Sequence, residues 1–372
     1  MYRILTLLLV TAFLLSGCKK SSSNLKWERT YEKGKAMYLA ATPDSGIAAC
    51  GEIENYPYFI KLNKNKDKVA DYKFPETGAY NTAWSNGLIS VATGYTNGKM
   101  LISCFSDSCK VLWDTTFSAS FQVNYSTLCY LGNGNLIVMA SGKMDSLYTS
   151  ITGLLTVWVN TNGTITGKTE HKESSYMAAG KIVSDNSGYI YLALTRKNQG
   201  SESKASVAKF PVALAAKPVW ETELYNNPSF GASTTTLTMD NSGNIFAAGK
   251  TQLPVSGGQM TNAFSVGLSS GGTIKWKDYL ELSNSAISVM PDDDGHILIL
   301  HQNCFIIYSL DSGLGTTSQV VRTFDACESA NTTNLGWSLD LDYNNYLLMA
   351  GQNGGRFYLC AKTPIVYTQG SN

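Results

Sequence analysis

The 372-residue sequence has few of the side chains that bind metals or nucleic acids. It contains three histidines and no pair of cysteines separated by two residues, so the usual ligand sets of zinc and haem sites are missing. Charged residues make up 15 % of the chain, which has no long basic run and, beyond Lys19-Lys20, no polybasic patch for a membrane surface. Without residues 1–17, whose only charged residue is Arg3, the chain has 28 basic and 28 acidic residues. A neutral chain lacks the electrostatic footprint of a nucleic-acid-binding protein. We therefore expect no metal, no cofactor and no nucleic-acid partner.

The residues that are abundant instead favour β-structure. The chain has 33 glycines and 21 tyrosines, and 44 % of its residues are hydrophobic. Low charge combined with many small and aromatic residues is typical of a folded all-β protein rather than a disordered one. About 350 residues exceed what one ordinary hydrophobic core holds, unless the fold is a repeat or a ring.

The N-terminal residues have the pattern of a secretory signal peptide. Arg3 precedes an apolar run from Ile4 to Leu15 that is too short to span a membrane. The sequence Leu15-Ser16-Gly17-Cys18 that follows resembles the bacterial lipobox, in which the cysteine is acylated and becomes the first residue of the mature protein. The resemblance implies removal of residues 1–17, a lipid anchor at Cys18 and a polar tether over residues 18–24. The alternative is a plain secreted protein in which this cysteine is coincidental.

Seven cysteines remain after Cys18, so at least one thiol must stay unpaired in an oxidising compartment. Cys104 and Cys109 flank a short turn and could form a disulfide across a hairpin. A weaker second candidate pair is Cys304 and Cys327. The others lie inside apolar runs and suit small buried residues of strands; they are Cys50, Cys129 and Cys360.

A repeat of about 41 to 55 residues runs along the chain. Seven Asp/Asn/Gly turns each lead into an apolar segment, at Gly or Asn positions 46, 87, 134, 188, 243, 295 and 345. Examples are SDNSGYIYLAL from Ser184 and MDNSGNIFAAG from Met239. Such turns join two short strands in a tight hairpin, where Gly or Asn adopts a positive φ.

A third strand follows each pair, and several repeats add a fourth strand with a fixed tryptophan. The third strands include YFIKL, LLTVWV and RFYLCA, and the fourth-strand tryptophans are Trp113, Trp220 and Trp276. Four strands in each of seven repeats, without helical periodicity, predict a seven-bladed β-propeller over residues 25–372. We interpret the tryptophans as packing between blades.

The two ends of the chain complement each other. LKWERTY around Trp27 matches the fourth-strand pattern but precedes the first full repeat, whereas the last repeat stops after its third strand. We therefore predict that the strand of Trp27 completes the last blade and closes the ring, which removes exposed sheet edges.

The cycle of Asp-x-x-Gly-x-Ile, apolar-Lys-Leu and x-Trp-x-x-x-aromatic resembles the PQQ-like and related bacterial propeller repeats over nearly all of the mature chain. In organisation the chain is also similar to the propeller lipoproteins of the outer-membrane β-barrel assembly machinery. Those lipoproteins have eight blades, one more than we count. The resemblance implies a propeller fold and says little about a ligand.

Aromatic residues recur just ahead of the first strand of several repeats. They are Tyr80, Phe121, Tyr176 and Phe230, with Trp337 close to the corresponding point of the last repeat. One interpretation is packing between neighbouring blades. The other is a ring of aromatics at the channel mouth that stacks on sugars or holds an extended peptide. Exposure of these rings would separate the two.

Other candidate features are weaker. The segments from Ser141, Thr195 and Lys250 are predicted to be long loops between second and third strands, and we interpret them as surface insertions. Asp292, Asp293 and Asp294 lack the alternating spacing of a calcium loop and suit a solvated turn. The sequence has no HExxH motif, and it has no GxSxG nucleophile elbow or phosphate-binding glycine loop that leads into a helix, so we assign no catalytic residue.

These observations favour a non-catalytic envelope lipoprotein whose propeller binds another protein. Lys19 follows the cysteine in place of the Asp that retains lipoproteins in the inner membrane, which by resemblance implies the outer membrane. The sequence KKSSSN lacks the acidic cluster of surface export, so a periplasm-facing position is favoured over the cell surface. The alternatives are a glycan-binding propeller and, less favoured, a glycan-cleaving hydrolase or lyase with dispersed carboxylates.

Overall fold

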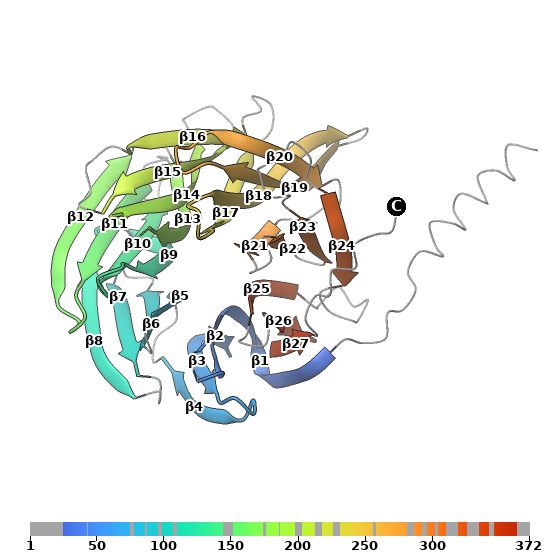
Figure 1. The fold of residues 1–372 in the computed structure, drawn as a ribbon. Helices are drawn as coiled ribbons and strands as arrows, with labels where there is room; N and C mark the ends of the chain where they lie inside the picture. The colour runs from blue at the N-terminus through green and yellow to red at the C-terminus, as the bar shows by residue number, and fades with distance from the viewer. Residues whose placement is uncertain are drawn as a thin grey trace, which may run out of the picture.

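The computed structural model is a ring of antiparallel sheets arranged around a central axis (Figure 1). The residues it describes are 25–42, 44–74, 78–85, 88–95, 99–106, 110–143, 152–173, 176–185, 187–197, 203–212, 218–225, 231–255, 258–280, 286–291, 296–301, 304–309, 319–325, 335–341 and 346–362. Over these residues the chain forms 27 strands and no helix. The predicted all-β propeller is confirmed.

Five of the sheets have four strands each, in sequence order from the axis outward. The first consists of β5 (Gly78–Ser85), β6 (Leu88–Tyr95), β7 (Lys99–Phe105) and β8 (Val111–Ser118). The second consists of β9 (Gln122–Tyr130), β10 (Leu136–Lys143), β11 (Thr152–Val159) and β12 (Ile165–Glu173). The third consists of β13 (Tyr176–Ser184), β14 (Tyr189–Lys197), β15 (Lys204–Pro211) and β16 (Trp220–Tyr225). The fourth consists of β17 (Ala232–Met239), β18 (Ile245–Val255), β19 (Gly258–Leu268) and β20 (Ile274–Leu280). The fifth consists of β21 (Ala286–Pro291), β22 (His296–His301), β23 (Cys304–Ser309) and β24 (Gln319–Asp325).

A sixth sheet of seven strands joins the two ends of the chain. Its order is β25 (Leu335–Leu341), β26 (Leu347–Asn353), β27 (Arg356–Lys362), β1 (Leu25–Ala41), β2 (Ile47–Ile53), β3 (Tyr56–Leu62) and β4 (Lys68–Lys73). The 17-residue β1 serves both halves: Leu25 to Lys33 pair with β27, and Gly34 to Ala41 pair with β2. The predicted closure by the strand of Trp27 is therefore confirmed.

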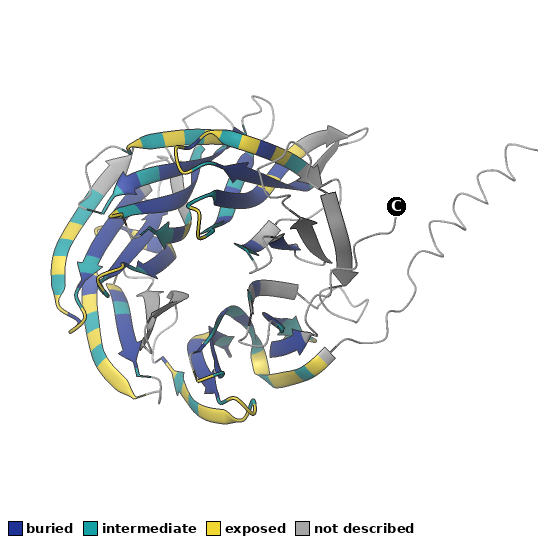
Figure 2. Ribbon diagram, in the orientation of Figure 1, coloured by how far each residue is buried: buried dark blue, intermediate teal, exposed yellow. Residues whose placement is uncertain are grey.

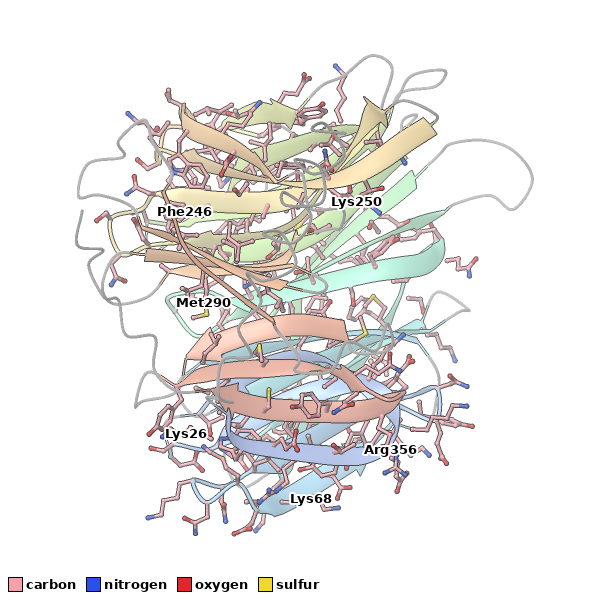
Figure 3. All side chains as sticks on the ribbon, turned by 90° about the vertical axis from the view of Figure 1, so that its right-hand side faces the viewer. Lys26, Lys68, Phe246, Lys250, Met290 and Arg356 are labelled. Carbon is pink, nitrogen blue, oxygen red and sulfur yellow. The ribbon has the colours of Figure 1, made fainter. Side chains whose placement is uncertain are left out.

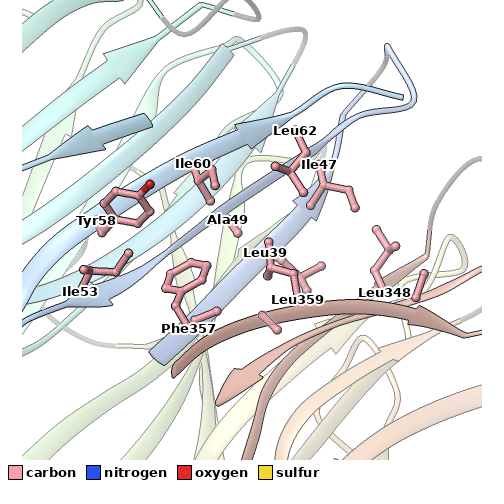
Figure 4. Close-up of a cluster of buried hydrophobic side chains, with 13 residues drawn as sticks. Leu39, Ile47, Ala49, Ile53, Tyr58, Ile60, Leu62, Leu348, Phe357 and Leu359 are labelled. Atoms are coloured by element: carbon pink, nitrogen blue, oxygen red, sulfur yellow. The ribbon is translucent and has the colours of Figure 1, made fainter. Parts of the chain in front are cut away.

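The core of this junction fills the space between β1, β2, β3 and the strands of the chain's end. Figure 4 shows Leu39, Ile47 and Ile60 facing Leu348, Phe357 and Leu359, and all six are buried. Trp27 packs against the same cluster. Burial of this apolar surface stabilises the contact between the first and last segments of the chain.

Burial changes from the inner to the outer strands. Strands β2, β3, β10, β11, β14 and β15, the second and third of their sheets, are mostly buried, whereas the outer strands β4, β8 and β16 alternate between exposed and partly buried residues, with one buried residue each in β8 and β16 (Figure 2). A sheet sandwiched between neighbours has apolar residues on both faces, and its outer edge strand meets solvent.

The predicted turns form as Asx turns. The Oδ1 atom of Asp185 accepts hydrogen bonds of 2.9 Å from the backbone N–H groups of Ser187 and Tyr189, and Asp240 does the same for Ser242 and Asn244. Gly134, Gly188 and Gly243 have positive φ, as the pattern predicted. In the first repeat Ser45 takes the positive φ instead of a glycine.

The buried Lys61 forms hydrogen bonds with the turn between β1 and β2. The Lys61 side chain is fully buried, and its ammonium group donates hydrogen bonds to Thr42 Oγ1 and, at 2.7 Å, to Asp44 Oδ1. Burial on its own would raise the pKa of Asp44, but the hydrogen bonds from Lys61, Thr42 and Gly46 outweigh it, so the pKa of Asp44 lies below its usual range. The third strand is thus tied to the turn between the first two.

Tryptophans of the outer strands pack against turns of the neighbouring sheets. Trp113 on β8 donates a hydrogen bond of 3.0 Å from Nε1 to the carbonyl of Thr161, which lies in the turn after β11. A Cβ atom at Gly163 in that turn would stand 2.6 Å from the Trp113 ring, so only glycine fits beneath it. The Trp220 ring likewise lies over Gly272 of the following sheet, where a Cβ atom would stand 2.7 Å from the ring. The interpretation of these tryptophans as blade packing is confirmed.

One predicted loop is wrong. The segment from Lys250 to Asn262 is an extended hairpin, in which β18 and β19 stay paired from Lys250 opposite Ala263 to Val255 opposite Gly258. The sequence predicts a loop here because the segment departs from the repeat and is longer than its equivalents in the other repeats. Pairing continues because the hairpin needs no buried face to form its backbone hydrogen bonds.

Candidate binding site in the central channel

A β-propeller encloses a channel along its axis, and the strands nearest the axis of this ring are the first strands of the sheets (Figure 1). They are β5, β9, β13, β17, β21 and β25, together with the second half of β1, and each lies against the next around the ring. A side chain on such a strand that is exposed must reach solvent through the channel or its mouths. Exposed side chains on these strands are therefore the candidates for contact with a ligand or partner.

The inner strands share a break in their pairing. The register shifts in β1, β9, β13, β17, β21 and β25, whereas β5 pairs with β6 continuously from Gly78 to Ser85. The bulged residues are Met37, Asn124, Gly180 with Lys181, Thr235, Ile287 and Trp337. A β-bulge redirects a side chain, and bulges are frequent beside functional sites.

Lys181 is the charged residue placed by the widest of these bulges. Its side chain is exposed although it lies on an inner strand. Surrounding protein lowers the pKa of the Lys181 ammonium group, and the negative charge of Asp340 partly opposes that effect. Gly180 beside it approaches the next inner strand so closely that a Cβ atom would stand 2.9 Å from the carbonyl oxygen of Thr235. The bulge thus needs glycine at this position.

Asp340 on β25 also contributes to the channel wall. Its Oδ2 atom accepts a hydrogen bond of 2.6 Å from the backbone N–H of Ala41. Ser338, two residues earlier, accepts one of 3.3 Å from the N–H of Leu39 through Oγ. Side chains of β25 therefore satisfy donors on the free edge of β1, which faces the channel.

Tyr125 is an exposed aromatic residue of the inner strand β9. Its side chain is 52 % exposed, unusual for a large residue in this part of the fold. It lies next to the bulge at Asn124. An exposed tyrosine supplies a flat apolar face together with a hydroxyl group, which suits contact with a peptide or a sugar.

The aromatic residues predicted as a ligand platform have different positions. Phe121 is 4 % exposed and packs in a core cluster with Met100, Leu155 and Val157, so its placement fits packing between sheets rather than a sugar platform. Tyr80 lies in β5, Tyr176 begins β13, and Trp337 occupies the bulge of β25, with side chains outside the described part of the structure. Phe230 lies outside the described residues altogether, so for these four the proposed role stays a prediction.

The cysteine predictions are resolved in part. Cys50, Cys129 and Cys360 are buried in strands, as predicted. Burial raises the pKa of the Cys129 thiol to about 12, against a smaller opposing effect of its hydrogen bond with Ser184. Cys104 is buried in β7, whereas its suggested partner Cys109 lies outside the described residues, as does Cys327. Cys18 and the Asp292-Asp293-Asp294 turn also lie outside them.

The described residues offer neither a metal site nor a membrane-spanning helix. Within the ranges given above, no group of three or more His, Cys, Asp or Glu side chains is placed to hold a metal ion. No helix in the same part of the chain is long and apolar enough to cross a membrane.

Sequence reasoning missed Lys181, Asp340 and Tyr125. A signal existed for the first, since AAGKIV places a lysine in the middle of an otherwise apolar inner strand. Nothing in the sequence marks Tyr125 as more exposed than the other tyrosines. Among the described residues, the site offers the ammonium group of Lys181, the carboxylate of Asp340 bound to backbone and the exposed phenol ring of Tyr125.

Comparisons with known proteins define the fold class and no family. No family model matches the sequence, and no curated protein matches it. Among solved structures the chain is similar to the WD40 β-propeller domain of Doa1, with a TM-score of 0.58, 11 % identity and coverage of 91 % of this chain and 96 % of that one. It is similar to virginiamycin B lyase from Staphylococcus aureus, with a TM-score of 0.56, 12 % identity and coverage of 91 % and 99 %. It is also similar to the C-terminal WD40 domain of Sif2, with a TM-score of 0.54, 11 % identity and coverage of 92 % and 99 %. At these identities the likeness establishes a β-propeller.

Proposed function

We propose that this protein is a lipid-anchored envelope protein whose propeller is a non-catalytic platform for another protein. The signal peptide and the Leu15-Ser16-Gly17-Cys18 sequence support an anchor at Cys18, and Lys19 supports an outer-membrane, periplasm-facing position. The tether of residues 18–24 leads directly into β1, the strand that closes the ring. The anchor would thus hold a rigid body rather than a flexible domain.

The platform has seven blades in this proposal. The seven-stranded sheet counts as two blades, because β1 bends from the edge of β27 to the edge of β2 and supplies one strand to each half. Together with the five four-stranded sheets this gives seven blades of four strands. The register shifts of β1 between Thr30 and Lys33 and between Ala36 and Tyr38 allow the bend.

The observation that carries the binding role is the exposure of Tyr125 and Lys181 on inner strands. Tyrosine is enriched among the residues that dominate binding energy at protein interfaces. The exposed ammonium group of Lys181 adds a donor for a carbonyl or carboxylate. An extended segment or loop of a partner that enters the channel mouth could contact both.

In-cell photo-crosslinking tests this proposal. A crosslinking amino acid placed at Tyr125 should yield one discrete protein adduct. The same amino acid at Thr116, an exposed residue of the outer strand β8, should yield none. Cys18→Ala should release the protein from membranes and weaken the adduct. Equal adducts at both positions, or membrane retention of Cys18→Ala, would contradict the proposal.

Glycan binding is the second candidate, and the exposed ring of Tyr125 is the observation that favours it. The two candidates differ in what occupies Tyr125. Protection of this residue by soluble envelope saccharides, with no protein adduct in cells, would favour the glycan candidate.

A further inference from the structure

Most of the exposed large apolar residues in the described part of the chain share one position in the fold. Within that part six large hydrophobic residues are exposed, and four of them stand at the start of outer strands: Val69 on β4, Val111 and Leu112 on β8, and Val219 just before β16. Their exposed fractions run from 41 % to 56 %. Outer strands start at the same end of every sheet, so these four side chains belong to one face of the ring.

That face is the one that carries the first-to-second and third-to-fourth turns, which we call the turn face. The third-to-fourth turns are residues 63–67, 106–110, 160–164 and 269–273, each closed by backbone hydrogen bonds. Figure 3 shows the ring from the side: Phe246, Met290 and Lys26 lie toward one face, and Lys250 and Arg356 toward the other. Phe246 and Met290 flank first-to-second turns, so Lys26 lies on the turn face.

The chain also enters the propeller on the turn face. Leu25, the first residue of β1, pairs with Lys362, and Lys362 pairs with Leu347 directly after the first-to-second turn of the last repeat. The seven tether residues can span at most about 25 Å. Reaching the opposite face would consume about 24 Å, the length of a seven-residue strand such as β27. A lipid on Cys18 would therefore hold the turn face close to the membrane.

Lysines accompany the exposed apolar residues. Lys68 precedes Val69, Lys110 precedes Val111, and both lysines are exposed. At the entry point Lys26 lies 5.5 Å above the ring of Tyr346, and Lys66 lies 5.7 Å from the ring of Trp27. The acidic groups here are partly engaged, since Asp71 pairs with Lys68 at 3.1 Å and Asp44 with Lys61 at 2.7 Å.

We propose that the turn face rests on the membrane, with Val69, Val111, Leu112 and Val219 at the level of the lipid headgroups and the neighbouring lysines on anionic phosphates. This inference rests on the proposed function, because the anchor at Cys18 selects the face. Apolar side chains interleaved with lysine are the composition of surfaces that lie in a membrane interface. The opposite mouth of the channel then points away from the membrane, toward a partner.

Spin labels in the acylated full-length protein test the orientation. The matched variants are Leu112→Cys and Thr116→Cys, which place labels on exposed residues at opposite ends of β8. The protein is bound to vesicles that contain phosphatidylglycerol, and the unsubstituted protein gives the background signal. The Leu112 label should collide with lipid-soluble oxygen more than with a water-soluble nickel complex, and the Thr116 label should show the reverse.

The contribution of the turn-face lysines is tested by reversing two positive charges on each face of the ring. Lys26→Glu with Lys110→Glu should shift the Leu112 label toward water and lower the membrane-seated population at least about tenfold. Lys33→Glu with Arg356→Glu, which alter exposed residues that pair with each other far from the turn face, should leave the label unchanged.

Vesicle flotation separates this inference from the proposed function. Floated protein with both labels in water would overturn the orientation and leave the anchor intact. Protein that carries no lipid and fails to float would overturn the proposed anchor, and with it the orientation that the anchor selects.

Discussion

Trp27 and Ala361, which stand near opposite ends of the chain, are register partners in one antiparallel pairing. The pairing runs from Leu25 opposite Lys362 to Lys33 opposite Arg356. It is reinforced by a hydrogen bond of 2.9 Å from the hydroxyl group of Tyr358 to Glu28 Oε2. The ring is therefore closed by non-local contacts that form only when both ends of the chain are in place.

Deletion of residues 25–31 should lower the thermal midpoint by about 10 °C or more. The deletion removes a row of backbone hydrogen bonds, each worth about 1 kcal/mol, and the packing of Trp27 against the junction core. Calorimetry measures the midpoint. Deletion of residues 19–24 from the tether is the control and should leave it unchanged; equal midpoints for both deletions would argue against closure by this strand.

Gly163→Ala should be more destabilising than Gly188→Ala by about 1–3 kcal/mol. Both glycines have nearly the same positive φ, +82° and +84°, so the backbone strain of alanine is alike. Only at Gly163 would the new Cβ atom meet the Trp113 ring, at 2.6 Å, whereas nothing lies within 4 Å at Gly188. Urea denaturation measures the difference, and equal losses would show that the tryptophan contact contributes little.

Asp44→Asn should lower the stability at pH 7 and flatten its dependence on acid. The Lys61 ammonium group is fully buried and would lose its charged partner. Because the Asp44 side chain is 47 % exposed, we expect about 2 kcal/mol rather than the larger loss of a fully buried pair.

The pH dependence follows from the lowered pKa of Asp44 in the folded protein. The stabilisation is present above the ordinary pKa of aspartate, about 3.9, and is lost as the pH falls through the lower folded value. Denaturant titrations between pH 7 and pH 2 should show this loss in the unsubstituted protein and not in Asp44→Asn. Asp67→Asn, in an exposed turn, serves as the control and should retain the loss.

Lys181 should titrate below the ordinary pKa of lysine, because surrounding protein disfavours its charged form. Asp340→Asn should lower the pKa of Lys181 further, since it removes the negative charge that favours the ammonium form. The asparagine can still accept the hydrogen bond from the Ala41 N–H. NMR titration of reductively methylated protein measures the pKa, and a rise in Asp340→Asn would show that the two side chains do not share the channel.

Much of the fold was predictable because its signals are local. Asx turns are specified within about five residues, as at Asp185 and Asp240, and a short apolar run follows each turn as the second strand. The fixed tryptophan marks the fourth strand. The hairpin of β18 and β19 was missed because backbone pairing there proceeds without an apolar pattern.

The site was far less predictable. Phe121 and Tyr125 are four residues apart and both aromatic, yet one is 4 % exposed and the other 52 %. The difference arises from neighbours distant in sequence: Gly153 on β11 leaves room for the Phe121 ring, while the bulge at Asn124 changes the direction of the strand before Tyr125. No local pattern reports either effect.

The sequence by itself determined the all-β class, the repeat, the turns and the strand that closes the ring. These features follow from backbone conformational preferences at the turns and from the short apolar runs that follow them, which act over a few positions. Only the tertiary structure decided which side chains reach solvent in the channel and on the turn face. Exposure depends on which sheets become neighbours, and each sheet packs against residues about fifty positions away, as Trp113 does against Gly163.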